Sequence, residues 1–189
     1  MTLDKSPTDI TDEETYWLRS QAVSDSPNVA GDGYFERHDV PFPEETTAEN
    51  LPPAEDVAVG SDEAVRELDR EALDEAKFIG KWQLTGSAER IEELWPELVA
   101  DAADEVLWAA KAMTGFGYEN LPMYDEYMIT VYTPNYFAKR DVDRVRDHLR
   151  EEYGVTKELL YKPDLYTAKG IVPDNVEEFG LSMAARYCE

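Results

Sequence analysis

Five polar residues within one ten-residue segment have the chemistry of an anion-binding site: Tyr161, Lys162, Asp164, Tyr166 and Lys169. Lysine ammonium groups and tyrosine hydroxyls donate hydrogen bonds to phosphate or carboxylate oxygens, and an aspartate beside them orients a lysine. The alternative is a structural turn, in which Pro163 fixes the backbone, Asp164 accepts amide hydrogen bonds and the lysines are solvated. The spacing alone leaves both interpretations open.

The composition of the whole chain gives these lysines their significance. Its 189 residues include 42 Asp plus Glu against 18 Lys plus Arg, for a formal net charge of -24. Such a surface repels polyanions over about 10 Å at 0.1 M salt, which disfavours nucleic acid as a partner except at high salt and excludes an anionic membrane. An acidic excess with few lysines is typical of a halophilic protein in a salt-saturated cytoplasm, where charge maintains solubility.

Two further cations are candidate ligand contacts. Lys111 interrupts the apolar segment 106–113, and in a strand it would share a face with Ala109 and Met113. A buried lysine must be paired or deprotonated, whereas a lysine at a sheet rim extends to water. Arg144 lies on a basic helix face, whose arginines we expect to pair with neighbouring aspartates and to serve structurally, with Arg144 as a supporting group.

Several kinds of chemistry have little support in this sequence. Only His38 and His148 are available for acid–base catalysis or a zinc site, and Cys188 has no partner for a disulfide or a thiolate metal cage. Gly115-Phe116-Gly117 lacks the third glycine of a dinucleotide fingerprint. No segment approaches the roughly 18 apolar residues of a membrane span. We therefore expect no metal, no cofactor and a reducing, cytoplasmic location.

The chain is predicted to form an N-terminal arm and one domain. Residues 1–60 are acidic and proline-bearing, which predicts a largely extended or disordered arm, followed by a single α+β domain over residues 61–189. The arm contains the aromatic patch Tyr16-Trp17-Leu18. Trp17 either docks back on the domain as an anchor or belongs to a short linear motif that binds a protein partner.

Hydrophobic periodicity predicts strands that alternate with helices. Helices are expected over residues 62–77 with Ser61 as N-cap, after Ser87 with a shortening or kink at Pro96, and over 141–152. Strands are expected at 81–84, 106–113, 126–132 and 157–162, the last followed by a polar loop. Within 106–113, the Ala-rich residues 108–110 could equally be helical. This order favours an α+β sheet covered on one face. Among the four tryptophans, Trp95 and Trp108 are expected in the core, which leaves Trp17 and Trp82 as a possible stacking platform for a base.

The chain resembles the uncharacterised family of the basophilic leukaemia-expressed protein over about residues 77–171. The motifs that carry this resemblance are Gly80-Lys81-Trp82, Leu94-Trp95, Ala109-Ala110-Lys111, Val131-Tyr132-Thr133, Asp141-Val142-Asp143-Arg144-Val145-Arg146, Leu160-Tyr161-Lys162-Pro163-Asp164, and Tyr166-Thr167 through Gly170. Tyr16-Trp17-Leu18 is similar to the tail of archaeal members. The resemblance implies a curved antiparallel sheet with helices on its convex face, like the cap-binding translation initiation factor.

Members of this family are sometimes labelled phosphothreonine lyases, which eliminate phosphate with a lysine base and a histidine acid close together in sequence. No Lys-x-His occurs in this chain. Our leading hypothesis is a cytoplasmic protein that binds a phosphorylated ligand, a nucleotide or a phosphopeptide, on the concave sheet face. The predicted contacts are Lys111, Tyr161, Lys162, Tyr166 and Lys169, supported by Asp164 and Arg144. The alternatives are a phosphothreonine lyase-like enzyme with Lys111 or Lys162 as base, and a protein-interaction adaptor that uses the arm around Trp17.

Overall fold

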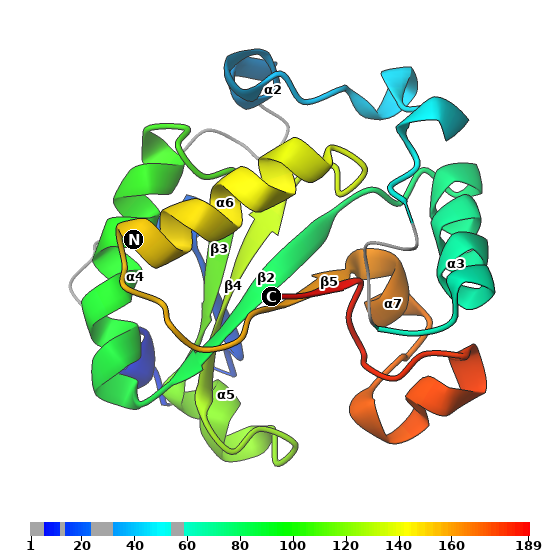
Figure 1. The fold of residues 1–189 in the computed structure, drawn as a ribbon. Helices are drawn as coiled ribbons and strands as arrows, with labels where there is room; N and C mark the ends of the chain where they lie inside the picture. Colours follow the sequence, from blue (N-terminus) through cyan, green and yellow to red (C-terminus); the bar gives the residue numbers. More distant parts are fainter. Residues whose placement is uncertain (1–5, 12–13, 24–31, 54–58) are drawn as a thin grey trace. The chain divides into compact units, whose positions relative to one another are not determined.

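The fold is α+β and contains one open six-stranded sheet (Figure 1). A computed structural model describes residues 6–11, 14–23, 32–53 and 59–189. The sheet order is β1-β3-β4-β2-β5-β6. The strands are β1 (Trp17–Arg19), β2 (Gly80–Gly86), β3 (Ala109–Met113), β4 (Tyr127–Thr133), β5 (Leu160–Pro163) and β6 (Tyr187–Cys188). The predicted α+β class is confirmed.

The described helices lie between and around these strands. They are α1 (Ser20–Val23), α2 (Asp32–His38), α3 (Asp62–Asp74), α4 (Ala88–Ala103), α5 (Gly115–Asn120), α6 (Lys139–Glu151) and α7 (Asp164–Ala168), with short 3-10 helices at Pro7–Asp9, Pro43–Glu45, Ala48–Asn50 and Pro173–Phe179. The chain divides into two compact units. The first unit combines Met1–Tyr34 with Gln83–Tyr132, and the second combines Phe35–Trp82 with Thr133–Glu189.

Local sequence signals explain where the long helices begin. The Ser61 hydroxyl accepts a hydrogen bond from the Ala64 amide at the start of α3, and the Ser87 hydroxyl accepts one from the Arg90 amide at the start of α4, both at 3.3 Å. The expected shortening of α4 at Pro96 is wrong, because the helix continues to Ala103. A proline inside a helix removes one backbone hydrogen bond. Burial of the apolar face of α4 on both sides of Pro96 offsets this cost.

The expectation of a polar loop after β5 is also wrong, because residues 164–168 form the helix α7. Pro163 is the N-cap residue with φ -60° and ψ 147°, and Asp164 places a carboxylate in the first turn, where the helix dipole favours it. Leu165 and Tyr166 are fully buried. The burial of these two side chains stabilises the helix. The polar residues of the segment gave no sign of it in the sequence.

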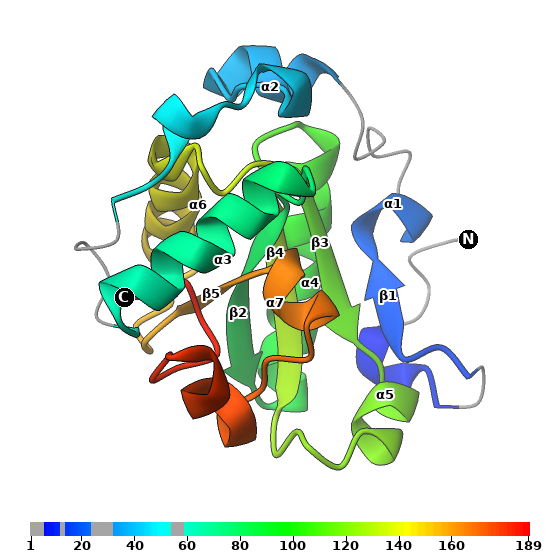
Figure 2. The same ribbon diagram turned by 90° about the vertical axis from the view of Figure 1, so that its right-hand side faces the viewer.

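In the first unit, β3 pairs antiparallel with both β1 and β4 (Figure 2). β1 lies beside β3 in register Trp17 opposite Met113, so the anchored-arm interpretation is confirmed for these residues. α4 packs against β3 with its buried apolar side chains. The other described residues of the predicted arm, some of which belong to the second unit, contribute α1, α2 and three 3-10 helices. Its residues 1–5, 12–13, 24–31 and 54–58 lie outside the described part of the chain.

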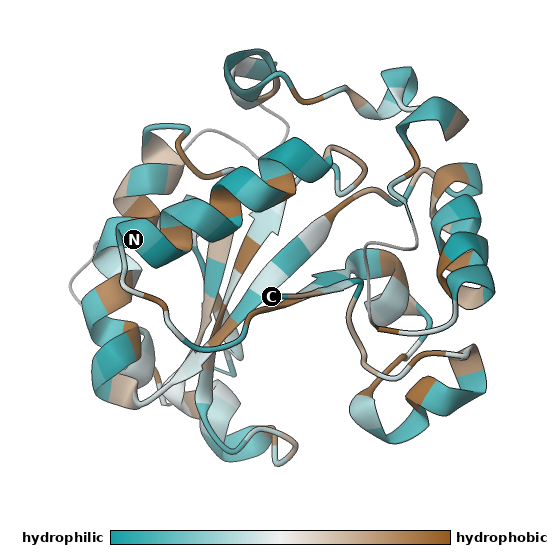
Figure 3. Ribbon diagram, in the orientation of Figure 1, coloured by the Kyte–Doolittle hydropathy of each residue, from teal (hydrophilic) through white to brown (hydrophobic). Residues whose placement is uncertain are grey.

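In the second unit, α6 shows the predicted amphipathic pattern, mostly hydrophilic with apolar positions at intervals (Figure 3). Val142, Val145 and Leu149 are fully buried, at helical spacing. Across residues 6–11, 14–23, 32–53 and 59–189, no helix combines the length and the apolar character needed to cross a bilayer.

A buried ion pair lies in the core of the second unit. Arg186 is 0% and Asp69 is 1% exposed, and Arg186 Nη2 donates to Asp69 Oδ2 at 2.9 Å. Asp69 Oδ1 also accepts from the Tyr136 hydroxyl at 2.9 Å. Removing one member of such a pair leaves its partner charged in a low-dielectric environment, which costs far more than the loss of a surface pair.

We predict that Asp69→Ala lowers the free energy of unfolding by about 3–5 kcal/mol, because it leaves the Arg186 charge buried without its carboxylate. Asp74→Ala, at an exposed position of the same helix, is the matched control and should have little effect. Urea denaturation followed by circular dichroism in concentrated KCl measures both. Equal midpoints for the two variants would contradict this role of the ion pair.

Candidate functional site

The predicted polar segment meets β2 in the second unit. Lys81 of β2 forms an ion pair with Asp164 and donates to Thr167 Oγ1 at 3.0 Å, and both of these acceptors belong to α7. Lys162 is half-buried, and its Nζ donates to the Ile171 carbonyl at 2.6 Å. Burial lowers the pKa of Lys162, the Lys81 charge lowers it further, and Asp164 opposes both effects. The junction therefore holds two lysines around one aspartate.

Tyr161 supports this junction from the core. Its side chain is fully buried, and its hydroxyl shares a 2.5 Å hydrogen bond with Thr133 Oγ1. Any side chain at residue 80 would collide with the Tyr161 ring, so this close approach requires Gly80. Trp82 is also fully buried, and its indole N–H donates to the Val142 carbonyl at 2.9 Å, so Trp82 is a core residue and no stacking platform.

Tyr166 and Lys169 have separate surroundings. Tyr166 is fully buried, and its hydroxyl has no hydrogen-bond partner within the described residues. Lys169 Nζ lies 2.6 and 2.7 Å from the two carboxylate oxygens of Glu71. The structure thus brings Lys162 and Asp164 together with Lys81, while Lys169 is engaged by its own carboxylate. Tyr161 and Tyr166 expose no surface to a ligand in this conformation.

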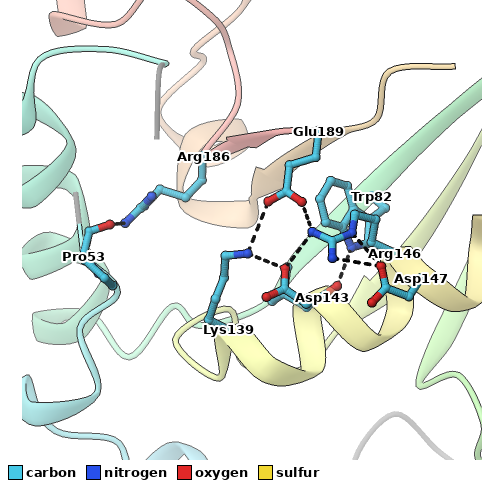
Figure 4. A network of polar contacts seen from close by, with 9 residues as sticks. Pro53, Trp82, Lys139, Asp143, Arg146, Asp147, Arg186 and Glu189 are labelled. Carbon is cyan, nitrogen blue, oxygen red and sulfur yellow. Dashed lines mark hydrogen bonds and ion pairs between the residues drawn. The ribbon is translucent and has the colours of Figure 1, made fainter. Parts of the chain in front are cut away.

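The basic residues of α6 form the structural pairs that the sequence predicts. Arg144 donates to Asp141 Oδ1 through Nε at 3.0 Å and through Nη2 at 2.9 Å. Figure 4 shows the neighbouring network, in which cations and carboxylates alternate: Lys139, Asp143, Arg146, Asp147 and Glu189. Arg144 therefore holds the buried Asp141 carboxylate at the start of α6.

Metal-ligating side chains do not gather in the described part of the chain. Over these residues, no group of three or more His, Cys, Asp or Glu is arranged to hold a metal ion. The ring of His148 packs edge-to-face on Tyr153, with the centroids 5.5 Å apart.

The buried tyrosines predict how stability depends on pH. Burial is the main cause that raises the pKa of Tyr136, Tyr161 and Tyr166. Above a pH of about 10 the unfolded chain releases these protons while the folded chain keeps them, so the free energy of unfolding falls. Each tyrosine adds up to about 1.4 kcal/mol per pH unit to this slope.

We predict that Tyr161→Phe makes the slope above pH 10 shallower by up to one proton, because it removes one of these groups. Denaturant titrations of the wild type and the variant between about pH 9 and 11 give the two slopes. Identical slopes would show that the Tyr161 hydroxyl is accessible and titrates normally in the folded protein.

A second candidate group lies on one face of the sheet in the first unit. The predicted strand is confirmed, and Lys111 pairs in register with Arg19 of β1 on one side and with Thr130 of β4 on the other. Side chains directly opposite each other on paired strands share a face, with Cβ atoms roughly 5 Å apart. We call these three residues the cation row. It places two positive charges next to one hydroxyl.

Aromatic rings border the cation row. Lys111 Nζ lies 4.8 Å from the ring centroid of Trp17 and 5.7 Å from that of Tyr132. Both rings share the face of Lys111, because Trp17 is two residues before Arg19 and Tyr132 is two residues after Thr130. Lys111 is half-buried, so it is neither a fully buried lysine nor a lysine that extends freely into water, the two possibilities that the sequence leaves open. Attraction to the ring faces holds its ammonium group at the sheet surface.

Thr130 supplies the third member of the row. Its side chain is 3% exposed, and its Oγ1 has no hydrogen-bond partner within the described residues. Arg19 is exposed at the strand edge. Sequence reasoning missed Arg19 and Thr130, because only the pairing register aligns them with Lys111. Like charges directly opposite each other on a sheet are unfavourable, so this arrangement suits an anion shared by both.

The fold and these polar groups define an α+β protein with cations gathered on a sheet face. The family model described as basophilic leukemia-expressed protein Bles03 matches residues 44–170. The chain therefore belongs to the Bles03 family, and the resemblance drawn from its motifs is confirmed. The match begins well before residue 77, where the resemblance was expected to start. A comparison with curated proteins found no match.

Proposed function

We propose that this chain binds a phosphorylated ligand, a nucleotide or a phosphopeptide, at the cation row of the first unit. The observation that carries this proposal is the direct register of Arg19, Lys111 and Thr130 on one sheet face. A phosphate group accepts hydrogen bonds from guanidinium and ammonium donors together, and the buried Thr130 lies in register beside Lys111. A bound phosphate would also relieve the repulsion between the two cations.

The aromatic border favours a nucleotide among these ligands. Trp17 and Tyr132 present ring surfaces beside the ammonium group of Lys111, and the Tyr124 ring meets Trp17 edge-on at 6.2 Å. A base stacked on an aromatic side chain gains about 1–3 kcal/mol. We further propose that this surface is the concave face of a curved sheet like that of the cap-binding translation initiation factor.

The other predicted contacts remain predictions. They are Lys162 and Asp164 at the junction, with Tyr161, Tyr166, Lys169 and Arg144 around it, and all of them belong to the second unit and lie outside the cation row. A reducing cytoplasm remains our proposed location, since the single cysteine has no partner for a disulfide. The adaptor alternative has less support, because Trp17 is engaged with β3 and Lys111.

We predict that Lys111→Ala and Arg19→Ala each weaken ligand binding at least tenfold, because each removes one charged donor to phosphate. Calorimetric titration in molar KCl with adenosine and guanosine phosphates and a phosphothreonine peptide measures the affinities. Lys157→Ala, at an exposed lysine outside the row, is the control and should bind as the wild type does. Lys162→Ala, titrated in parallel, shows whether the junction contributes.

Unchanged affinity in both row variants, or no binding by any ligand of the panel, would remove the proposal. Circular dichroism of each variant confirms that weaker binding does not come from unfolding.

We propose as a second candidate function a phosphothreonine lyase-like elimination, with the half-buried Lys162 beside Lys81 and Asp164 as base. In this reaction a neutral lysine takes the Cα proton, the Cβ–O bond breaks, phosphate leaves with its electron pair and a C=C bond forms. A lysine with a lowered pKa is a better base near neutral pH. The structure supplies no neighbouring histidine from a Lys-x-His motif, so the leaving phosphate would depart without that acid.

If the second function is real, incubation with a phosphothreonine peptide should give a product that has lost phosphoric acid and gained an alkene. Mass spectrometry detects this change. Lys162→Met should abolish it, whereas Lys157→Met should not. An intact peptide after prolonged incubation with the wild type would exclude the lyase.

A further inference from the structure

The second unit contains a pocket that the proposed function does not use. Its volume is about 240 Å³, and the described residues that line it are Leu51, Pro52, Pro53, Arg66, Asp69 and Arg70. Arg66 and Arg70 stand one helical turn apart on α3, and both are exposed. Leu51, Pro52 and Pro53 form an apolar wall.

Among the described lining residues, the carboxylate of Asp69 does not oppose an anion strongly. Asp69 accepts from Arg186 Nε at 3.1 and 3.2 Å, from Arg186 Nη2 at 2.9 Å and from the Tyr136 hydroxyl at 2.9 Å. Its negative charge is therefore offset by a fully buried guanidinium. Arg66 and Arg70 add two positive charges at the pocket, in a chain with a formal net charge of -24.

Arg186 also contacts the backbone of this wall and keeps one donor without a partner among the described residues. Its guanidinium is planar, and its Nε–Nη2 edge is occupied by Asp69. The second Nη2 hydrogen points along the adjacent edge, and Nη2 lies 3.4 Å from both the Pro52 and Pro53 carbonyl oxygens. Figure 4 shows the contact with Pro53. Nη1 shares the adjacent edge. It is buried and has no hydrogen-bond partner within the described residues. A buried donor of this kind is unusual in a native protein.

We infer that this pocket binds an oxyanion, a phosphate or a carboxylate, carried on a compact apolar group. Arg66 and Arg70 supply charged donors for the oxyanion, and the apolar wall contacts the body of the ligand. Pockets for drug-sized ligands usually have about 300–1,000 Å³, so the volume of this pocket suits a small anion. The site is separate from the cation row and rests on different residues.

The test is calorimetric titration in molar KCl with orthophosphate, phenyl phosphate and benzoate. The wild type should bind phenyl phosphate or benzoate saturably with one site, and more tightly than orthophosphate, because only the first two ligands contact the apolar wall. Tighter binding of phenyl phosphate assigns the site to phosphate esters, and tighter binding of benzoate assigns it to carboxylates.

Arg66→Gln with Arg70→Gln should weaken the binding at least tenfold, whereas Arg140→Gln, at an exposed arginine of α6, should leave it unchanged. Because Arg66 and Arg70 are exposed, the double variant should keep its denaturation midpoint. Lys111→Ala, which removes a proposed contact of the cation row, serves to separate the two sites, and the binding that the arginine double variant loses should persist in it. Binding that survives in the arginine double variant but is lost in Lys111→Ala belongs to the cation row and overturns this inference. The absence of saturable heat with all three anions overturns it as well.

Discussion

The pairing register of β3 with its two neighbours decides which side chains share a sheet face. Because side chains alternate along a strand, a shift of one residue would move Arg19 and Thr130 to the face opposite Lys111. The same register places Trp17 and Tyr132 beside the ammonium group. The candidate site therefore depends on backbone hydrogen bonds between segments far apart in sequence, and β1, with three residues, fixes one side of it.

Scarce cations in this acidic chain have two kinds of surroundings. Arg186, Arg144 and Lys169 each pair with a nearby carboxylate and hold helices or core segments in position. The cation row sets two cations in register on neighbouring strands, and the α3 pocket sets two guanidinium groups near an aspartate that is paired with Arg186. High salt screens the long-range repulsion between the acidic surface and an anion, so short-range donors of this kind can act.

Sequence patterns predict the elements whose causes are local. The N-caps Ser61 and Ser87, and the apolar stripe of α6, depend on residues three or four positions apart. α7 was missed because Pro163 and Asp164 also fit a turn, and only the burial of Leu165 and Tyr166 decides for a helix. Polar residues of one segment were predicted as one site, but the strand and helix that carry them send Tyr161 and Tyr166 into the core. Arg19, Thr130 and Lys81 could not be found without the strand pairing and the packing of α7.

A double-mutant cycle between Arg19 and Lys111 tests the central claim most directly. Arg19→Gln, Lys111→Gln and the double variant would be unfolded by urea without ligand, at the lowest salt that keeps the wild type folded. We predict a repulsive coupling. Each substitution should lower the free energy of unfolding more in the background of the other variant than in the wild type, because only in the wild type does it also remove the repulsion. When the cycle is repeated with the phosphorylated ligand that binds most tightly, this repulsive coupling should disappear. An attractive or zero coupling in the ligand-free protein would contradict the account.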